Sequence, residues 1–446
     1  MLRAALPAVL CLGLLSPGPA QAQTAPPPSG AVPVAVETAV PAEPAAAAAA
    51  EAYPPVVEIA FEGNEVTRPS TMLRELVIAV GDPADPQRIE KSRQALLDLG
   101  LFKKVVDRQE AVEGGVRVVF KVDERYYFFP LPRADAKADG QYSYGVQVAW
   151  DNVLGLNHRM RVFWVDSDRK RQDIGKERTY SLSYSAPFIG DSPYGLNFGS
   201  SYTIRPVETP QGYYEETLQD FALGFTRTYS KGAASQGWTV GAGLKWSREA
   251  TSGPFAEPEY GDATAPYAYV RYRDFHYHVF SETGRTYSAS VSSARDGWGS
   301  DYSFTNWNLY YADYLHVGRT EHQTVHFQAR VGAYFSGPER VDAYGIGGPQ
   351  NLRGYETNFI EGNGYYRVAL EYARPLRATW PWLRGVVILE GGNVFDEPED
   401  ISFDKVYTSL GLGLRIRLTN FVDVELEAGW AVPLNGGPGR YYGGRV

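Results

Sequence analysis

Cysteine is nearly absent from this sequence, because Cys11 is the only one among 446 residues. It lies inside the apolar stretch from Ala4 to Leu15, which follows Arg3 and precedes Ala20-Gln21-Ala22. A positive start, an apolar core and a site flanked by small residues are typical of a secretory signal. We therefore expect residues 1–22 to be a signal peptide. The mature chain would then lack cysteine, which excludes a disulfide-stapled domain.

Basic charge is also scarce. The chain has 43 Lys and Arg residues against 52 Asp and Glu residues, a formal net charge of −9. Nucleic-acid binding needs a basic surface to meet the phosphates, and no stripe of Lys and Arg supplies one here. We expect no nucleic-acid partner.

Patterns that indicate catalysis or metal binding are missing as well. Among six histidines, His276 and His278 have a spacing that suits metal ligands, but no third ligand accompanies them. Girdle or loop histidines are the favoured interpretation of this pair. No nucleophile elbow and no phosphate-binding loop occurs. The sequence therefore predicts no enzyme, no metal site and no cofactor.

Long apolar runs end with the signal. No later stretch of about 18 uncharged apolar residues could form a transmembrane helix. A transmembrane barrel stays open, because its strands alternate between apolar and polar residues and keep the average hydropathy low.

Aromatic residues are abundant but confined to one part of the chain. Residues 126–446 hold 30 of the 31 Tyr, all nine Trp and 17 of the 20 Phe. Residues 23–55 are rich in Pro and Ala with few large apolar side chains, so we expect an extended linker there. The chain thus divides into a linker, a small domain over 56–123 and a strand-rich region over 124–446.

The small domain has the pattern of an α+β unit. An alternating strand around residues 57–61 is followed by helices that start after Arg68 and Asp85, and by strands over 102–110 and 116–122. The runs Ile59 to Asn64 and Ser92 to Phe102 resemble a POTRA domain, so 56–123 is identified as one such domain. The resemblance implies a periplasmic domain that receives client segments by β-augmentation. The alternative is a spacer that only orients the next domain.

The sequence pattern of the aromatic-rich region, residues 124–446, predicts a β-barrel. Apolar and polar residues alternate in stretches of about 9 to 12 residues, which suits tilted membrane-crossing strands. Tyr and Trp crowd the strand ends, as in interface girdles. Sixteen candidate strands can be counted, eleven before a Gly-rich loop at 336–363 and five after it. The predicted fold is an all-β transmembrane barrel of about 16 antiparallel strands, preceded by one small α+β POTRA domain.

The Gly-rich loop carries a motif from Tyr344 to Tyr355. It resembles the loop signature of the BamA/TamA-like outer-membrane assembly and translocation superfamily. Arg353, Gly354 and Tyr355 match the tip that folds into the barrel in that superfamily, where the Arg pairs with acidic residues on the wall.

Strand parity independently supplies candidate partners for Arg353. Apolar neighbours at Val368, Leu370, Val387 and Leu389 would face lipid, which places Glu371 and Glu390 in the lumen. A charge-assisted pair with either carboxylate would hold the loop inside. The alternative is that Arg353 is one more luminal arginine. Parity also places Asp423, Glu425 and Glu427 inside.

Two prolines lie in the first barrel strand. Pro130 and Pro132 each remove a ladder donor, so the seam between the first and last strands should be weakly paired. The superfamily is thought to open this seam for clients. The alternative is a hinge from the POTRA domain.

These features leave three functional hypotheses. The favoured one is an outer-membrane factor that assembles or inserts client proteins. A dedicated secretion pore for an exoprotein and a structural or lipid-handling barrel are the alternatives. A single POTRA domain indicates an accessory or divergent member. The resemblance implies the outer membrane of a Gram-negative bacterium, with the POTRA domain in the periplasm. Implied partners are unfolded outer-membrane or secreted proteins, outer-membrane lipid and periplasmic accessory proteins.

Overall fold

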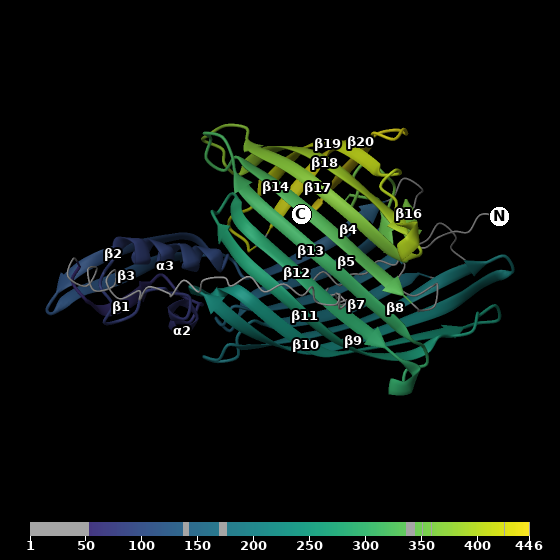
Figure 1. Cartoon of the computed structure of the whole chain (residues 1–446), viewed down its shortest axis with the longest axis horizontal. Coiled ribbons are helices and arrows are strands. Elements are labelled where there is room, and N and C mark those ends of the chain that lie inside the picture. Colours follow the sequence, from purple (N-terminus) through teal and green to yellow (C-terminus); the bar gives the residue numbers. More distant parts are fainter. Residues whose placement is uncertain are drawn as a thin grey trace, which may run out of the picture.

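A computed structural model describes residues 53–136, 142–168, 176–335, 344–349, 351–357, 359–422 and 424–445 (Figure 1). The predicted signal peptide and linker lie outside these residues, except for 53–55, and so does Asp423. Among the described residues, no helix is both long enough and apolar enough to cross a bilayer.

The first described unit is the expected α+β fold. Its elements are β1 (Val56–Glu62), α2 (Pro69–Leu73), α3 (Pro86–Asp98), β2 (Phe102–Val112) and β3 (Gly115–Glu124). The sheet has the order β1-β3-β2, with β1 parallel and β2 antiparallel to β3. Asp85 caps α3 by accepting a bond of 2.9 Å from the Gln87 backbone N–H, and Pro86 takes the first helical position, where its missing donor costs nothing.

Helix α2 is shorter than the apolar pattern through Val77 predicts, because it ends at Leu73. Tertiary bonds replace the next helical turns. The Val77 backbone N–H donates to Ser92 Oγ at 3.0 Å, and the Val77 carbonyl accepts from Arg88 at 2.7 Å. Both partners belong to α3, so packing against that helix overrides the local propensity.

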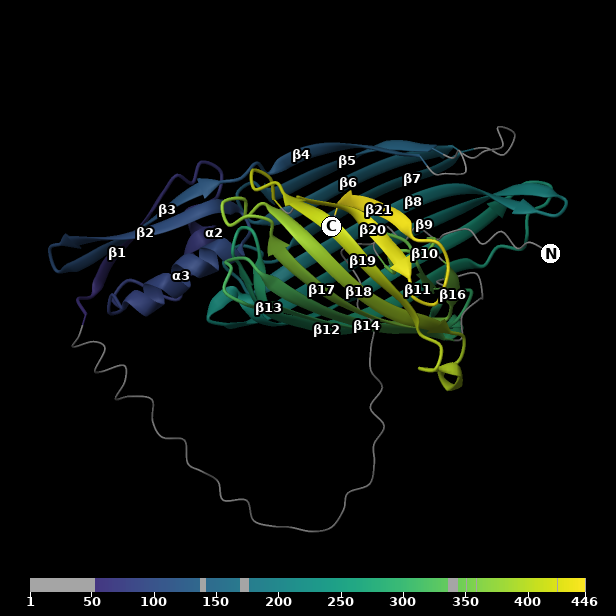
Figure 2. The same ribbon diagram turned by 90° about the horizontal axis from the view of Figure 1, so that it is seen from above.

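The rest of the chain forms one sheet of sixteen antiparallel strands, which confirms the predicted barrel strand number. The strands are β4 (Phe128–Ala136), β5 (Tyr142–Val153), β6 (His158–Asp168), β7 (Glu177–Ala186), β8 (Tyr194–Thr209), β9 (Gly212–Lys231), β10 (Ala233–Ser252), β11 (Gly261–Tyr277), β12 (Glu282–Ala294), β13 (Phe304–His316), β14 (Thr324–Phe335), β17 (Gly364–Pro375), β18 (Leu383–Phe395), β19 (Tyr407–Arg417), β20 (Glu425–Pro433) and β21 (Arg440–Arg445). Consecutive strands pair with one another, and β14 pairs with β17 across the long loop. Figures 1 and 2 show the sheet curled into a barrel.

The two faces of the barrel wall differ as the alternation predicts. Leu370 and Leu389 are 44% and 45% exposed, whereas Glu371 and Glu390 are 8% and 1% exposed. Apolar side chains therefore cover the outer wall and charged ones are buried inside. This arrangement suits a barrel surrounded by lipid.

The α+β unit docks on one rim of the barrel (Figure 2). Asp98, at the end of α3, is buried and accepts bonds from the Tyr277 backbone N–H at 2.8 Å and from Gln94 at 2.7 Å. Arg125 donates to the Tyr277 hydroxyl at 2.8 Å and to the Phe421 carbonyl at 2.9 Å. Because these contacts join α3 and the residue after β3 to the end of β11 and to the segment before β20, the unit has a fixed orientation on the rim.

Candidate functional site

The long loop returns into the barrel through a small hairpin that sequence patterns did not predict. Strand β15 (Tyr344–Ile346) pairs with β16 (Ile360–Gly362). The Tyr344 hydroxyl lies 3.0 Å from Asn306 Nδ2 and 3.1 Å from Asn308 Nδ2 on the inner face of β13. The base of the loop is thereby attached to the wall.

The loop tip is buried. Leu352 is fully buried, and Arg353 and Tyr355 are 6% and 7% exposed. Gly354 has φ +91°, and a Cβ atom there would lie 3.1 Å from the Ala431 carbonyl carbon of β20. Only glycine combines this left-handed conformation with so close an approach.

Arg353 meets three carboxylates on the wall. Its backbone N–H and its Nη1 donate to Glu390 Oε2 and Oε1, each at 2.7 Å. Its Nη2 lies 3.3 Å from Glu371 Oε1 and 3.5 Å from Glu427 Oε1. The structure thus brings Arg353 together with both acidic residues singled out by parity and adds Glu427. The guanidinium also lies over the ring of Tyr442 in β21, with 5.4 Å between its carbon and the ring centroid.

Two wall arginines complete this cluster, which we call the upper layer. Arg367 bonds Glu390, and Arg415 lies 2.7 Å from Glu371 and also pairs with Glu427. Three carboxylates therefore face two wall cations, and Arg353 supplies the third positive charge. Without Arg353, one buried carboxylate would lack a balancing cation, which is costly in a desolvated site.

A second cluster, the lower layer, lies closer to the rim on which the α+β unit docks. Arg384 is 2.7 Å and Arg417 is 3.0 Å from Glu425, and Arg417 also pairs with Glu282. This layer is balanced by wall residues alone. The loop cation is therefore needed only in the upper layer.

Tyr355 fixes the other end of the tip. Its hydroxyl donates to the Thr408 carbonyl at 3.0 Å, with Asn435 Oδ1 3.2 Å away, and its ring lies 4.8 Å from that of Phe359. Arg353 therefore contacts β18, Gly354 contacts β20 and Tyr355 contacts β19, and the three tip residues lie together as one site.

The predicted seam residues lie elsewhere, at a free edge of the sheet. The strand order ends at β4 on one side and β21 on the other, and no pairing joins the two within the described residues. Pairing of β4 with β5 is continuous from Phe128 to Ala136. Since alternate residues of a strand bond one neighbour, the nitrogens of Pro130 and Pro132 face away from β5, toward the edge.

Strand β4 has a different neighbour at its base. Tyr126 forms an isolated parallel bridge with Phe421, and its backbone N–H donates to the Asn420 carbonyl at 2.8 Å. The ring of Phe129 lies 4.4 Å from that of Phe421. The start of β4 therefore packs against the segment before β20.

His276 and His278 have separate partners. His276 Nδ1 lies 2.9 Å from Asp98 in α3, and His278 Nε2 lies 2.8 Å from Thr283 Oγ1. The described residues contain no group of three or more His, Cys, Asp or Glu side chains arranged around a metal position.

Comparison with known proteins adds the family context. A family model described as POTRA, surface antigen variable number repeat, matches residues 54–125. A second, described as haemolysin secretion/activation protein ShlB/FhaC/HecB, matches residues 133–416, well over half of the chain.

Solved structures with the same fold include two called CdiB. CdiB from Escherichia coli has a TM-score of 0.59 at 15% identity, over 85% of this chain and 73% of that one. CdiB from Acinetobacter baumannii has a TM-score of 0.55 at 16% sequence identity, and the match covers 85% of this chain and 70% of that one. BamA from Haemophilus ducreyi lacking POTRA domains 1-3 has a TM-score of 0.51 at 15% sequence identity, and the match covers 88% of this chain and 84% of that one. At these identities the likeness concerns the fold.

Proposed function

The chain belongs to the haemolysin secretion/activation protein family ShlB/FhaC/HecB, and from this membership we propose that it exports a partner protein through its barrel. Membership also confirms the resemblance to the BamA/TamA-like superfamily. Translocation or assembly of proteins is the shared activity of such barrels. The specific role proposed is secretion of a dedicated exoprotein across the outer membrane of a Gram-negative bacterium.

The observation that carries this proposal is the placement of Arg353. A buried guanidinium held by Glu390, Glu371 and Glu427 keeps the loop tip inside the lumen. An exported chain needs that space, so the tip must leave or shift during transport. Because the upper layer needs a third cation, the closed state is favoured until a client competes for the loop position.

The POTRA domain is proposed to receive the client on the periplasmic side. Strand β2 is an edge of its sheet and offers unpaired backbone groups over Phe102–Val112. An extended client segment can add to this edge without a fixed sequence. The docked orientation set by Asp98 and Arg125 would then direct the segment to the barrel rim.

The test is a deletion strain in which the secreted proteins and the outer-membrane proteins are both quantified. The proposal expects one or a few secreted proteins to disappear while outer-membrane barrels stay at normal levels. Wild type and Arg330→Ala should restore export, and Arg353→Ala should not. Arg330 is a matched control because it is an exposed luminal arginine over the Tyr310 ring. It lies opposite Arg367 in register, but it forms no ion pair with any carboxylate that the structure describes. Unchanged secretion in the deletion strain would contradict the proposal.

A second candidate function is insertion of outer-membrane proteins, and one observation favours it. The free edge of β4, where Pro130 and Pro132 withhold two donors, is a place where client strands could enter. Loss of outer-membrane barrels with intact secretion in the same strain would favour this function.

A further inference from the structure

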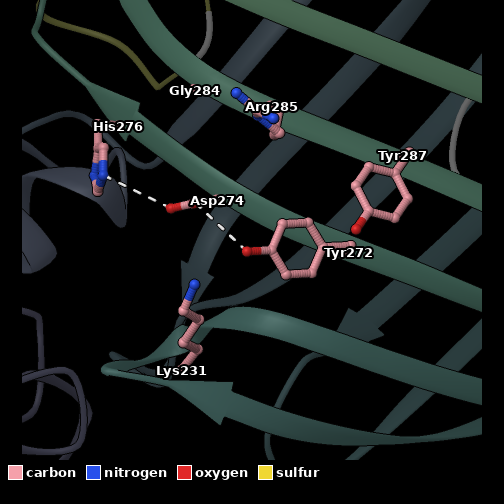
Figure 3. Close-up of a pocket in the computed structure, with 7 residues that line it drawn as sticks. All are labelled: Lys231, Tyr272, Asp274, His276, Gly284, Arg285 and Tyr287. Atoms are coloured by element: carbon pink, nitrogen blue, oxygen red, sulfur yellow. Dashed lines mark hydrogen bonds and ion pairs between the residues drawn. The ribbon is translucent and has the colours of Figure 1, made fainter. Parts of the chain in front are cut away.

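A polar pocket lies on the outer wall of the barrel at the POTRA rim, away from the luminal site. It has a volume of about 450 Å³ and is lined by residues of β11, β12 and the end of β9 (Figure 3). Its lining residues are Lys231, Tyr272, Asp274, His276, Gly284, Arg285 and Tyr287. Tyr272 pairs in register with Trp238, which is 42% exposed on the lipid face, so Asp274 and His276, two and four residues on, share that outer face.

The pocket contains two cations whose side chains have no hydrogen-bond or ion-pair partner among the described residues. Figure 3 shows dashed lines from Asp274 to His276 and to Tyr272, and none to Lys231 or Arg285. The Tyr272 hydroxyl donates to Asp274 Oδ2 at 3.4 Å, and His276 Nε2 lies 3.9 Å from Asp274 Oδ1. Neither the Lys231 side chain nor the Arg285 side chain makes a hydrogen bond or ion pair with any residue that the structure describes.

Charges of both signs alternate around the pocket. The register places Arg285 opposite Asp274 on one side and opposite Asp313 on the other. Asp313 accepts a bond of 3.1 Å from the Tyr311 hydroxyl, as Asp274 does from Tyr272. The pocket thus holds two cations and Asp274, and Asp313 lies in register beside Arg285 next to the lining. This set of charges complements a ligand that carries both a phosphate and an ammonium group.

An apolar groove continues from the pocket along the outer wall. It has a volume of about 430 Å³, and Tyr287 lines both cavities. The groove is bordered by Trp238, Val270, Ala289, Leu309, Tyr311 and Val331. The Tyr287 ring stacks on Tyr272 at 4.9 Å and on Tyr311 at 6.5 Å, which gives the junction a rigid aromatic floor.

We propose that the pocket and groove together bind one zwitterionic glycerophospholipid of the periplasmic leaflet. Its phosphate lies between Lys231 and Arg285, its ammonium lies near Asp274 and Asp313, and one acyl chain follows the groove. Aromatic and basic residues at the ends of membrane-crossing strands suit this headgroup level. The inference rests on the membrane placement in the proposed function and is independent of the client.

The site also touches the POTRA docking contact. His276 lines the pocket and lies 2.9 Å from Asp98 of α3 through its other ring nitrogen. A bound headgroup would therefore lie directly beside the contact that orients the POTRA domain.

The test is native mass spectrometry of the full chain in detergent, titrated with phosphatidylethanolamine, phosphatidylglycerol or inorganic phosphate. We expect a single phosphatidylethanolamine to bind, more tightly than phosphatidylglycerol, and inorganic phosphate not to displace it. The double variant Lys231→Gln/Arg285→Gln should weaken binding by about tenfold or more, since charged hydrogen bonds are lost. Ala289→Trp should weaken it by filling the groove while both cations remain.

Arg248→Gln is the matched control, because Arg248 has the same outward parity on β10 but lies near the strand's other end, with 49% of its side chain exposed. It should bind as wild type. Equal binding by the double variant and by Arg248→Gln would overturn the site, and tighter binding of phosphatidylglycerol or inorganic phosphate would overturn the headgroup assignment. Heat-modifiability on gels reports folding of each variant. Unchanged secretion in the deletion strain, with lipid binding by the purified chain intact, would count against the proposed function alone.

Discussion

Arg353 Nη1 lies 2.7 Å from Glu390 Oε1, although the two residues are 37 positions apart and belong to a loop and a wall strand. Both side chains are buried, at 6% and 1% exposure. The loop thus contributes the one cation that the upper layer lacks, and removal of this cation should affect both stability and transport.

Stability provides the first prediction. Arg353→Ala should lower the free energy of unfolding of the barrel by about 3 kcal/mol, because it leaves a buried carboxylate without a partner. Arg330→Ala should change it by less than about 0.5 kcal/mol. Urea unfolding followed by gel shift measures both. Adding Glu390→Gln to Arg353→Ala should recover part of the loss, and a fully additive double variant would contradict the pairing.

The glycine at the loop tip provides the second prediction. Gly354→Ala should displace the tip, because φ +91° and the 3.1 Å approach to Ala431 leave no room for a methyl group. Trypsin should then cleave after Arg353 in the folded barrel, whereas the wild type resists. Gly297→Ala is the control, since nothing lies within 4 Å of a Cβ at that position. Equal resistance of both variants would argue against a buried tip.

The docking of the POTRA domain should depend on pH through Glu75. This residue is buried, and it accepts a bond of 2.9 Å from the Ser235 backbone N–H in the barrel. Burial raises the pKa of Glu75 above its ordinary value of 4.5. An acid with a raised pKa in the folded state stabilises docking below its ordinary pKa, and this contribution is lost as pH rises through the folded value.

Hydrogen exchange of α2 measures this dependence. Protection in the wild type should fall as the pH rises above the ordinary pKa of 4.5 and through the raised folded value. Glu75→Gln should remove the fall and raise protection at neutral pH. The surface variant Glu113→Gln should keep the wild-type profile, and an unchanged profile in Glu75→Gln would refute the assignment.

Period-two alternation predicted much of the luminal site, because parity alone decides which face Glu371 and Glu390 occupy. Parity does not determine how far along the barrel axis an inward side chain lies, or which side chains meet across the lumen. Parity placed Glu427 inside, but its position between Arg415 and Arg353 depends on the register of β19 with β20. The loop motif was needed to bring Arg353 into the lumen at all.

No pattern in the sequence predicted the contacts between the α+β unit and the barrel. Asp98 reads in the sequence as an ordinary polar residue at a helix end, yet it is buried against Tyr277, 179 positions away. The early end of α2 has the same origin, because Val77 is bonded by α3. Tertiary contacts determine both the burial of Asp98 and the early end of α2. Local sequence patterns contain no information on such contacts.

Whether the client passes through the lumen is tested most directly by tying the start of β4 to the segment before β20. Tyr126 and Phe421 are bridge partners, and such neighbours have Cα atoms about 5 Å apart, within the range of a disulfide. The double variant Tyr126→Cys/Phe421→Cys has no competing cysteine beyond Cys11. Export of the secreted partner by this variant is measured with the disulfide formed and after its reduction. A luminal route predicts equal export in both states, and export that stops on locking and returns on reduction would contradict it.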